Sequence, residues 1–318
     1  MGKRNTGRAL DGILIVDKPQ GLTSNGVVSR LKRWTKAKKV GHTGALDPMA
    51  TGVLPIVFGE AAKFSQYGLE ANKGYVARVQ LGTATNTLDA DGEVVAEQDI
   101  PVIDEALLRG VLQSLTGDLM QIPPMVSALK HQGQPLYKLA RQGVEIERPP
   151  RAIHIFVNEL LQFDANEGWL EIRVHCSKGT YIRSLAESIA DQLQTVAHLS
   201  ALRRELSGGF TLDHAHSWLA LQSTCEAAQS DPKTLLKPMD AILGHFPRLD
   251  LTENECMTLI QGKKVSGKGV GECGIMRAYF AGERFIGLVT VDSDDVIAAK
   301  RMLSPVAAGM RGVTDFGQ

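Results

Sequence analysis

The segment from residue 41 to residue 52, GHTGALDPMATG, constrains the fold more than any other part of the chain. Its three glycines permit backbone angles that side chains forbid, and Pro48 keeps the preceding Asp47 away from the helical region. The apolar run 53–58 follows at once and would anchor the segment in a core. The segment therefore predicts a tightly specified loop that places a single acid, Asp47.

Two interpretations of Asp47 are open on spacing alone. An Asp-Pro pair is common at the start of a helix, where the aspartate caps the helix and contributes roughly 1 kcal/mol. Alternatively, the loop holds the carboxylate as a chemical reagent. The cap does not account for His42 and Thr43, which lie inside the same bracket of glycines.

The rest of the chain mixes strands with helices without a regular strand–helix–strand order. Apolar residues at alternating positions predict strands, and apolar residues at helical spacing predict helices. This mixture favours an α+β fold over a doubly wound sheet. The strands are expected over residues 12–17, 75–81 and 169–176, and the helices over about 24–36, over 104–115, after Tyr181 and within 213–237.

The chain changes character near residue 248. Seven glycines between residues 262 and 287 separate short apolar runs such as 285–291, and this spacing is typical of a small β-rich domain. We therefore expect one domain over residues 1–248 and a second over residues 249–318.

Residues 122–151 differ from their surroundings. Five prolines flank or interrupt a short helical stretch near Tyr137–Arg141, and five basic side chains outnumber two acidic ones. The segment reads as a basic insertion that closes on RNA, or alternatively as an ordinary surface excursion. Its length without a clear strand favours a functional role.

The charges are unevenly distributed, although the whole chain has no net charge. Residues 1–63 carry eleven basic and four acidic side chains, so the remainder is acidic overall. A positive region beside Asp47 suits a polyanion such as nucleic acid. The alternative is a solvated, lysine-rich helix.

Composition excludes several classes of protein. No apolar run approaches the roughly eighteen residues of a membrane helix, and the run 13–16 is too short for a signal peptide. The four cysteines form no Cys-x-x-Cys pair, which indicates reduced thiols in a cytoplasm. The eight histidines show no metal-ligand spacing with acids or cysteines, so we expect neither a metal nor a cofactor.

Several further motifs follow one another in a recognisable order. Together with the glycine-bracketed segment, they resemble the TruB family of tRNA pseudouridine synthases from about residue 10 to about residue 300. The motifs are GILIVDKPQGLTS at 12–24, KGY at 73–75, LGTATNTLDADG at 81–92, PPMVSALK at 123–130, KGTYIR at 178–183 and LRR at 202–204.

The resemblance implies a fold and an activity. The fold is a mixed, largely antiparallel sheet flanked by helices, with a thumb-like insertion at 122–151 and a C-terminal RNA-binding domain of the PUA type. The activity is the conversion of uridine to pseudouridine at position 55 in the T-loop of tRNA, with extrusion of the base. The chain lacks the extended basic tails of relatives that use guide RNA, so we expect a stand-alone, monomeric enzyme that binds the T-stem-loop.

The resemblance also implies catalytic residues. Asp47 corresponds to the catalytic aspartate, and Arg183 to the arginine beside it, which would keep a carboxylate in a dry pocket ionised. Tyr75 corresponds to the active-site tyrosine, which could stack on the flipped uracil or relay a proton. The alternatives are a phosphate contact for Arg183 and a core position for Tyr75.

Five further residues are expected to bind the substrate. Tyr181 and Leu202 would line the pocket, and His42 would occupy the space of an extruded base in the T-loop. Lys18 would contact phosphate, and Lys63 belongs to the basic N-terminal region. The alternatives are a backbone-bonded turn histidine for His42, simple solvation for Lys18 and a core position for Leu202.

Two positions depart from the family pattern, and two other functions compete. Asn86 stands where an aspartate is usual, and His131 where a tyrosine is frequent, which leaves the contacts of both segments open. The competing functions are a non-catalytic tRNA-folding protein and a base-excising hydrolase. A lone acid argues against ordinary glycoside hydrolysis, which typically uses two carboxyl groups.

Overall fold

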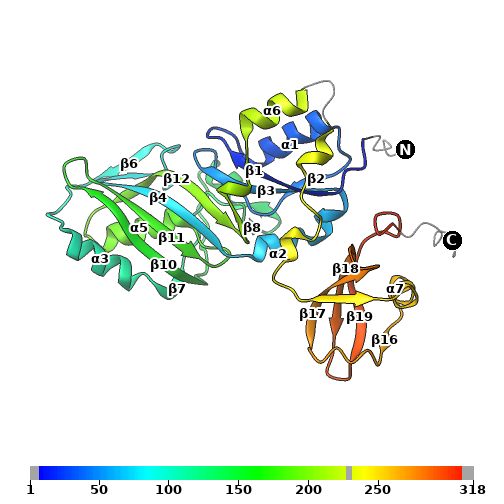
Figure 1. The fold of residues 1–318 in the computed structure, drawn as a ribbon. Helices are drawn as coiled ribbons and strands as arrows, with labels where there is room; N and C mark the ends of the chain where they lie inside the picture. Colours follow the sequence, from blue (N-terminus) through cyan, green and yellow to red (C-terminus); the bar gives the residue numbers. More distant parts are fainter. Residues whose placement is uncertain (1–6, 227–230, 310–318) are drawn as a thin grey trace.

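The computed structural model describes residues 7–226 and 231–309 of the 318-residue chain. Within these ranges the chain forms one large sheet flanked by helices, followed by a smaller sheet near the C-terminus (Figure 1). None of the described helices is long and apolar enough to cross a membrane.

Ten strands form the large sheet. They are Gly12–Lys18 (β1), Val40–His42 (β2), Thr51–Phe58 (β3), Lys73–Leu81 (β4), Gly117–Gln121 (β7), Arg151–Asp164 (β10), Trp169–Cys176 (β11), Ala197–Ser207 (β12), Phe210–Thr211 (β13) and His216–Ser217 (β14). Eight follow the order β14-β1-β3-β12-β4-β11-β10-β7, while β2 pairs with β3 and β13 with β12. Two pairs, β1·β14 and β3·β12, are parallel, and the other described pairs are antiparallel. The expected mixed, largely antiparallel sheet is confirmed.

Two helices cover one face of this sheet. Helix α3 (Glu105–Ser114) begins at Asp104, whose side chain accepts a hydrogen bond from the Leu107 amide. Helix α5 (Ile182–Gln192) begins directly after Tyr181. The apolar sides of both helices share a core with the inward-facing residues of β4 and β11. These helices were predicted from the spacing of their apolar residues.

Helix α1 (Ser24–Thr35) packs on the other part of the sheet, beside β1 and β3. The Thr23 hydroxyl accepts a hydrogen bond from the Gly26 amide and fixes the first turn. Helix α6 (Trp218–Glu226) lies against α1 through a pair of tryptophan rings. The prediction of helix within residues 213–237 is confirmed for α6 alone; residues 227–230 lie outside the described part.

Short elements connect the larger ones. They are Gly59–Phe64 (η1), Ser65–Glu70 (α2), Thr83–Thr85 (β5), Val94–Glu97 (β6), Lys130–His131 (β8), Gln134–Pro135 (β9), Leu136–Ala140 (α4), Leu212–His214 (η2), Pro232–Leu235 (η3) and Ala241–Leu243 (η4). The insertion contains the hairpin of β8 and β9 and the short helix α4, near the predicted position.

The C-terminal part is β-rich, as expected. Its strands are Arg248–Leu251 (β15), Val265–Ser266 (β16), Gly274–Phe280 (β17), Arg284–Val291 (β18) and Val296–Met302 (β19), in the order β15-β17-β18-β19-β16. Helix α7 (Glu253–Ile260) was not predicted. The apolar core of this sheet is continuous with residues of β1, β3, η1 and α2, and the rings of Phe64 and Phe285 meet edge to face.

Candidate active site

The loop that carries Asp47 is fixed by residues on both sides of it. The Leu46 amide donates to the Ser24 hydroxyl at 2.7 Å, and the Gly21 amide donates to the Pro48 carbonyl at 2.8 Å. No helix begins at Asp47: the chain bends after Pro48 and enters β3 at Thr51. The helix-cap interpretation of Asp47 is therefore wrong, and the carboxylate is free for another partner.

Lys18 supports this loop from inside. Its ammonium is buried and donates to the carbonyls of Pro19, Leu22 and Pro48. Burial lowers the pKa of Lys18 to about 8, although the Asp47 carboxylate opposes this effect. In the structure the three carbonyls are the partners of the ammonium and the side chain is buried; the phosphate contact with bound RNA stays a prediction.

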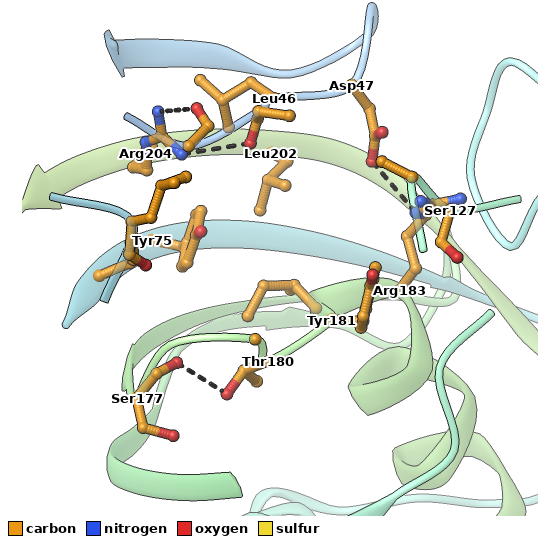
Figure 2. A pocket seen from close by; sticks show the side chains of 17 residues that line it. Leu46, Asp47, Tyr75, Ser127, Ser177, Thr180, Tyr181, Arg183, Leu202 and Arg204 are labelled. Atoms are coloured by element: carbon orange, nitrogen blue, oxygen red, sulfur yellow. Dashed lines mark hydrogen bonds and ion pairs between the residues drawn. The ribbon is translucent and has the colours of Figure 1, made fainter. Parts of the chain in front are cut away.

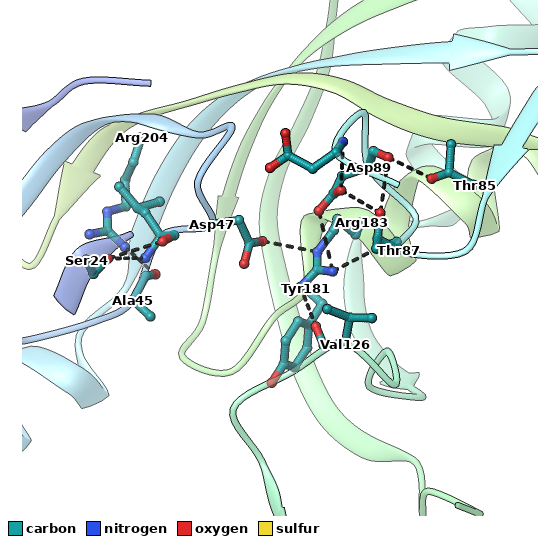
Figure 3. A network of polar contacts seen from close by, with 12 residues as sticks. Ser24, Ala45, Asp47, Thr85, Thr87, Asp89, Val126, Tyr181, Arg183 and Arg204 are labelled. Carbon is teal, nitrogen blue, oxygen red and sulfur yellow. Dashed lines mark hydrogen bonds and ion pairs between the residues drawn. The ribbon is translucent and has the colours of Figure 1, made fainter. Parts of the chain in front are cut away.

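Asp47 forms an ion pair with Arg183, which lies in the first turn of α5 (Figure 3). The Arg183 Nε atom is 3.1 Å from the Asp47 carboxylate, and the arginine side chain is only 5% exposed. The two terminal nitrogens donate to the carbonyls of Thr87 and Val126, each at 2.8 Å. These contacts hold the guanidinium with one edge toward Asp47.

A second carboxylate, Asp89, lies 3.5 Å from Arg183 and is equally inaccessible. The Thr87 hydroxyl donates to it at 2.6 Å and the Asp91 amide at 3.2 Å (Figure 3). Sequence reasoning quoted the motif that contains Asp89 but missed this role. The signal was a pair of aspartates, Asp89 and Asp91, in a loop that ends at Gly92, and nothing in the sequence alone aims that loop at Arg183.

Asn86 closes the same loop. Its side-chain oxygen accepts a hydrogen bond from the Glu93 amide at 3.1 Å, and the backbones of these two residues are also bonded. A neutral side chain thus fills the position where the family pattern has an acid. Asn86 does not contact Arg183, so this departure leaves the Asp47–Arg183 pair intact.

Burial dominates the ionisation of Asp47. It raises the pKa of this carboxyl above the ordinary value; Arg183 opposes the rise, while Asp89 and Asp91 add to it. The side chain is still 40% exposed, because one side of it faces an open cavity. The guanidinium thus favours the ionised carboxylate, as the resemblance implies, although burial outweighs its effect on the pKa of Asp47.

The cavity beside Asp47 has a volume of about 340 Å³ (Figure 2). Tyr75, Tyr181 and Leu202 line it together with Arg183, as expected from the sequence. Burial raises the pKa of both tyrosines, so both hydroxyls stay protonated. Two aromatic walls, one leucine and one carboxylate are suited to hold a planar, uncharged ring next to a reactive acid.

His42 and Lys63 do not line this cavity. The Nδ1 atom of His42 accepts a hydrogen bond from the Gly44 amide at 3.3 Å, as in the alternative of a turn histidine. Burial, followed by the nearby Arg204, lowers the pKa of His42, which favours the neutral ring. The ammonium of Lys63 pairs with Glu60 and donates to the Met302 carbonyl, which joins η1 to the C-terminal sheet; its contact with the substrate stays a prediction.

Two basic residues of the cavity were missed by sequence reasoning. Arg204 and Lys73 both line it, and both side chains are almost completely buried. Lys73 donates to the carbonyls at the end of α2, and burial lowers its pKa to about 8. The alternation of β12 could have revealed Arg204, because it lies two residues after Leu202 and therefore on the same face.

The described residues contain no group of three or more histidines, cysteines, aspartates and glutamates arranged to hold a metal ion. No disulfide joins the four cysteines within the described residues. The polar side chains that line the cavity include Asp47, Arg183, Arg204, Lys73 and two tyrosine hydroxyls.

Comparison with known proteins assigns both parts of the chain. Residues 32–182 match the TruB family pseudouridylate synthase (N terminal domain), and residues 247–303 match Pseudouridine synthase II TruB, C-terminal. The tRNA pseudouridine synthase B of Aromatoleum aromaticum is 43% identical over 97% of each chain. That of Azoarcus sp. is 47% identical over 88% of this chain and 91% of the relative.

Solved structures share the fold at lower identity. A Cbf5-Nop10-Gar1 complex contains a chain that is 24% identical, with a TM-score of 0.71 over 92% of this chain and 85% of that chain. The archaeal box H/ACA sRNP Nop10-Cbf5 complex contains one that is 21% identical, with a TM-score of 0.70 over 97% and 90%. These likenesses establish the architecture of the two sheets.

Proposed function

Because this chain belongs to the TruB family and is a tRNA pseudouridine synthase, we propose that it isomerises the uridine at position 55 in the T-loop of tRNA. The observation that carries the proposal is the Asp47–Arg183 pair, 3.1 Å apart, at the edge of a cavity walled by two tyrosines. The reaction breaks the bond from ribose C1′ to uracil N1 and forms one from C1′ to C5. The proton of C5 is lost and N1 gains one, so the product has the mass of the substrate.

The uridine must leave the folded T-loop to reach this cavity. Extrusion of a base costs a few kcal/mol, which stacking and contacts to the edge of the base offset. Tyr75 and Tyr181 are the stacking surfaces in this proposal, and Leu202 fills the space between them. Asp47 is the reacting carboxylate. The base stays in the cavity throughout, so no second acid is required.

The proposal assigns the RNA backbone to two basic regions. One is the end of α1, where Lys32 and Arg33 lie in the last turn, and the other is the insertion at 122–151 with its helix α4. His42 contacts the remodelled T-loop. Residues 249–318 act as a PUA-type RNA-binding domain beside a catalytic domain of residues 1–248. The enzyme acts as a monomer without guide RNA, in the cytoplasm where its substrate is found.

Treatment of a T-arm RNA with wild-type protein and with Asp47→Asn tests this proposal. We expect wild type to leave the RNA mass unchanged while producing a site that reacts with the carbodiimide used to mark pseudouridine. Asp47→Asn should form less than about a thousandth of that product, while the Kd for the RNA stays within about tenfold, or 1.4 kcal/mol.

Asp118→Asn is the matched control, because Asp118 is 93% exposed on β7, pairs with His154, and should be replaceable without loss of product. Free uracil and an abasic RNA would identify a hydrolase instead. Tight binding without product by wild type would identify a tRNA-folding protein. Normal turnover by Asp47→Asn would remove Asp47 from the mechanism.

A further inference from the structure

Arg204 is a buried cation that no acid neutralises. It is 1% exposed, and no carboxylate in the described ranges lies within ion-pair distance of it. The neighbouring Arg203 shows the usual arrangement: it lies on the opposite face of β12, is 41% exposed and forms a two-pronged pair with Asp17. Isolated charges are costly to bury, so a strand that places one inside needs a specific reason.

The carbonyls that Arg204 contacts lie before and after the reacting acid, Asp47, in the chain. Its Nε atom donates to the Val53 carbonyl at 2.7 Å, and its terminal nitrogens donate to the carbonyls of Ala45 and Gly44 at 3.3 and 3.2 Å. Two of these carbonyls precede Asp47 in the chain and one follows it. The planar fork of a guanidinium can hold several acceptors in fixed directions, which an ammonium cannot.

The same guanidinium lies beside Tyr75. Arg204 and Tyr75 are directly opposite each other on β12 and β4, and both line the cavity. Residues directly opposite each other in an antiparallel pair have Cβ atoms about 4.5–5.5 Å apart. The phenol of Tyr75 therefore lies next to a buried positive charge. Figure 2 shows Tyr75 and Arg204 at one end of the cavity and the Asp47–Arg183 pair at the other.

We propose that Arg204 is a positioning residue for catalysis: it clamps the Asp47 loop through three carbonyls and keeps a positive charge next to Tyr75, where the flipped base would lie. This inference rests on the proposed function, because it requires a base in the cavity. The carbonyls that accept hydrogen bonds from the guanidinium are neutral and do not cancel its positive charge. This charge lies at the Tyr75 end of the cavity. There it favours any negative charge that the detached base acquires.

The test compares single-turnover rates and RNA affinities of Arg204→Lys, Tyr75→Phe and the double variant. Arg204→Lys keeps the charge and loses the fork. We expect its rate at saturating T-arm RNA to fall at least 30-fold, while the Kd for the RNA stays within threefold. Because the two side chains face each other across β12 and β4 and act on the same base, the double variant should be at least fivefold faster than the product of the two single losses predicts.

Arg203→Lys is the matched control, since it makes the same change on the same strand and faces away from the cavity. We expect it to retain the wild-type rate within threefold. Arg204→Gln provides a second variant that removes the buried charge yet keeps two N–H donors. It should unfold cooperatively and lose at least as much rate as Arg204→Lys.

Four outcomes would overturn the inference. They are an Arg204→Lys rate equal to that of Arg203→Lys, single losses that simply multiply in the double variant, a rise in Kd that matches the loss in rate, and failure of both Arg204 variants to unfold cooperatively. The last would make Arg204 a purely structural residue. A wild-type protein that forms no pseudouridine on the same RNA would instead overturn the proposed function.

Discussion

At the scale of single residues, two buried arginines lie at opposite ends of the cavity, and the two ends differ in charge. Arg183 lies between two carboxylates, Asp47 and Asp89, and donates to two carbonyls. The hydrogen bonds of Arg204 within the described residues go to three backbone carbonyls. The end at Asp47 is therefore compensated, whereas the end at Tyr75 keeps a positive charge.

The ionisation of Asp47 should set the acid limb of the rate profile. If the reaction needs the carboxylate, the rate falls as pH drops through the pKa of Asp47, which burial raises above the ordinary value. Asp89 contributes to this rise, so Asp89→Asn should lower the pKa of Asp47 and move the limb to lower pH. Single-turnover rates across the acid range, measured beside wild type and Asp118→Asn, check this. An unmoved limb would show that Asp89 does not act on Asp47.

At the scale of elements, the loop before β3 depends on a close backbone approach. Gly52 has a φ of +103°, and a Cβ atom there would lie 2.2 Å from the Arg204 carbonyl oxygen. The glycine lets β3 run parallel to β12 at this point, which brings the loop over the guanidinium. The geometry of the site is thus built on one position without a side chain.

Gly52→Ala should destabilise the protein and slow the reaction. A positive φ costs a non-glycine residue about 1–3 kcal/mol, and the overlap with β12 adds to this cost. Gly262→Ala is the control, because Gly262 has a φ of +77° but no atom within 4 Å of its missing Cβ. Denaturant midpoints and single-turnover rates should show a larger loss of stability for Gly52→Ala and a loss of rate for it alone. Equal losses would mean that the close approach is relaxed easily.

The elements that the sequence predicted were those with strong local signals. Helices α1 and α3 have a side-chain cap and a regular apolar stripe, and β11 has a strict alternation. Helix α7 was overlooked although Thr252 and Glu255 form a capping box, which is a readable signal. The parallel pairing of β3 with β12 joins residues about 150 positions apart, and no local pattern specifies such a pairing.

The site was predictable to a similar degree. Family resemblance named Asp47, Arg183, Tyr75, Tyr181 and Leu202, and the structure brings these five residues to one cavity. It could not name the groups that support them, because support depends on which carbonyls and acids the fold brings near. Nor could it show that the ammonium groups of Lys18 and Lys63 bind protein atoms in the folded chain.

At the scale of the whole molecule, the two sheets share one apolar core. Phe64 of η1 contacts Phe285 of β18, and Glu60 accepts a hydrogen bond from the Ser304 amide. The interface is thus both apolar and specifically bonded. A C-terminal part attached in this way should unfold together with the large sheet rather than separately.

Phe285→Ala tests this cooperativity. Removal of a buried phenylalanine typically costs 3–5 kcal/mol, roughly, and should lower the midpoint of unfolding for the entire chain. The three tryptophans, at 34, 169 and 218, all lie outside the C-terminal sheet, so their fluorescence reports on the other part. We expect this signal to shift together with far-UV circular dichroism, whereas Val306→Ala, at an exposed position, shifts neither. Unshifted tryptophan fluorescence would show independent unfolding.

The hydrogen bond from Arg183 to the Val126 carbonyl limits how this enzyme can be redesigned. It ties the segment that begins the insertion to the side chain that pairs with Asp47, so a graft of a foreign insertion would also replace a ligand of that arginine. An engineer who wishes to retarget the enzyme to another RNA hairpin should therefore exchange the insertion downstream of residue 126. The backbone of Val126 would then remain as part of the chemical apparatus.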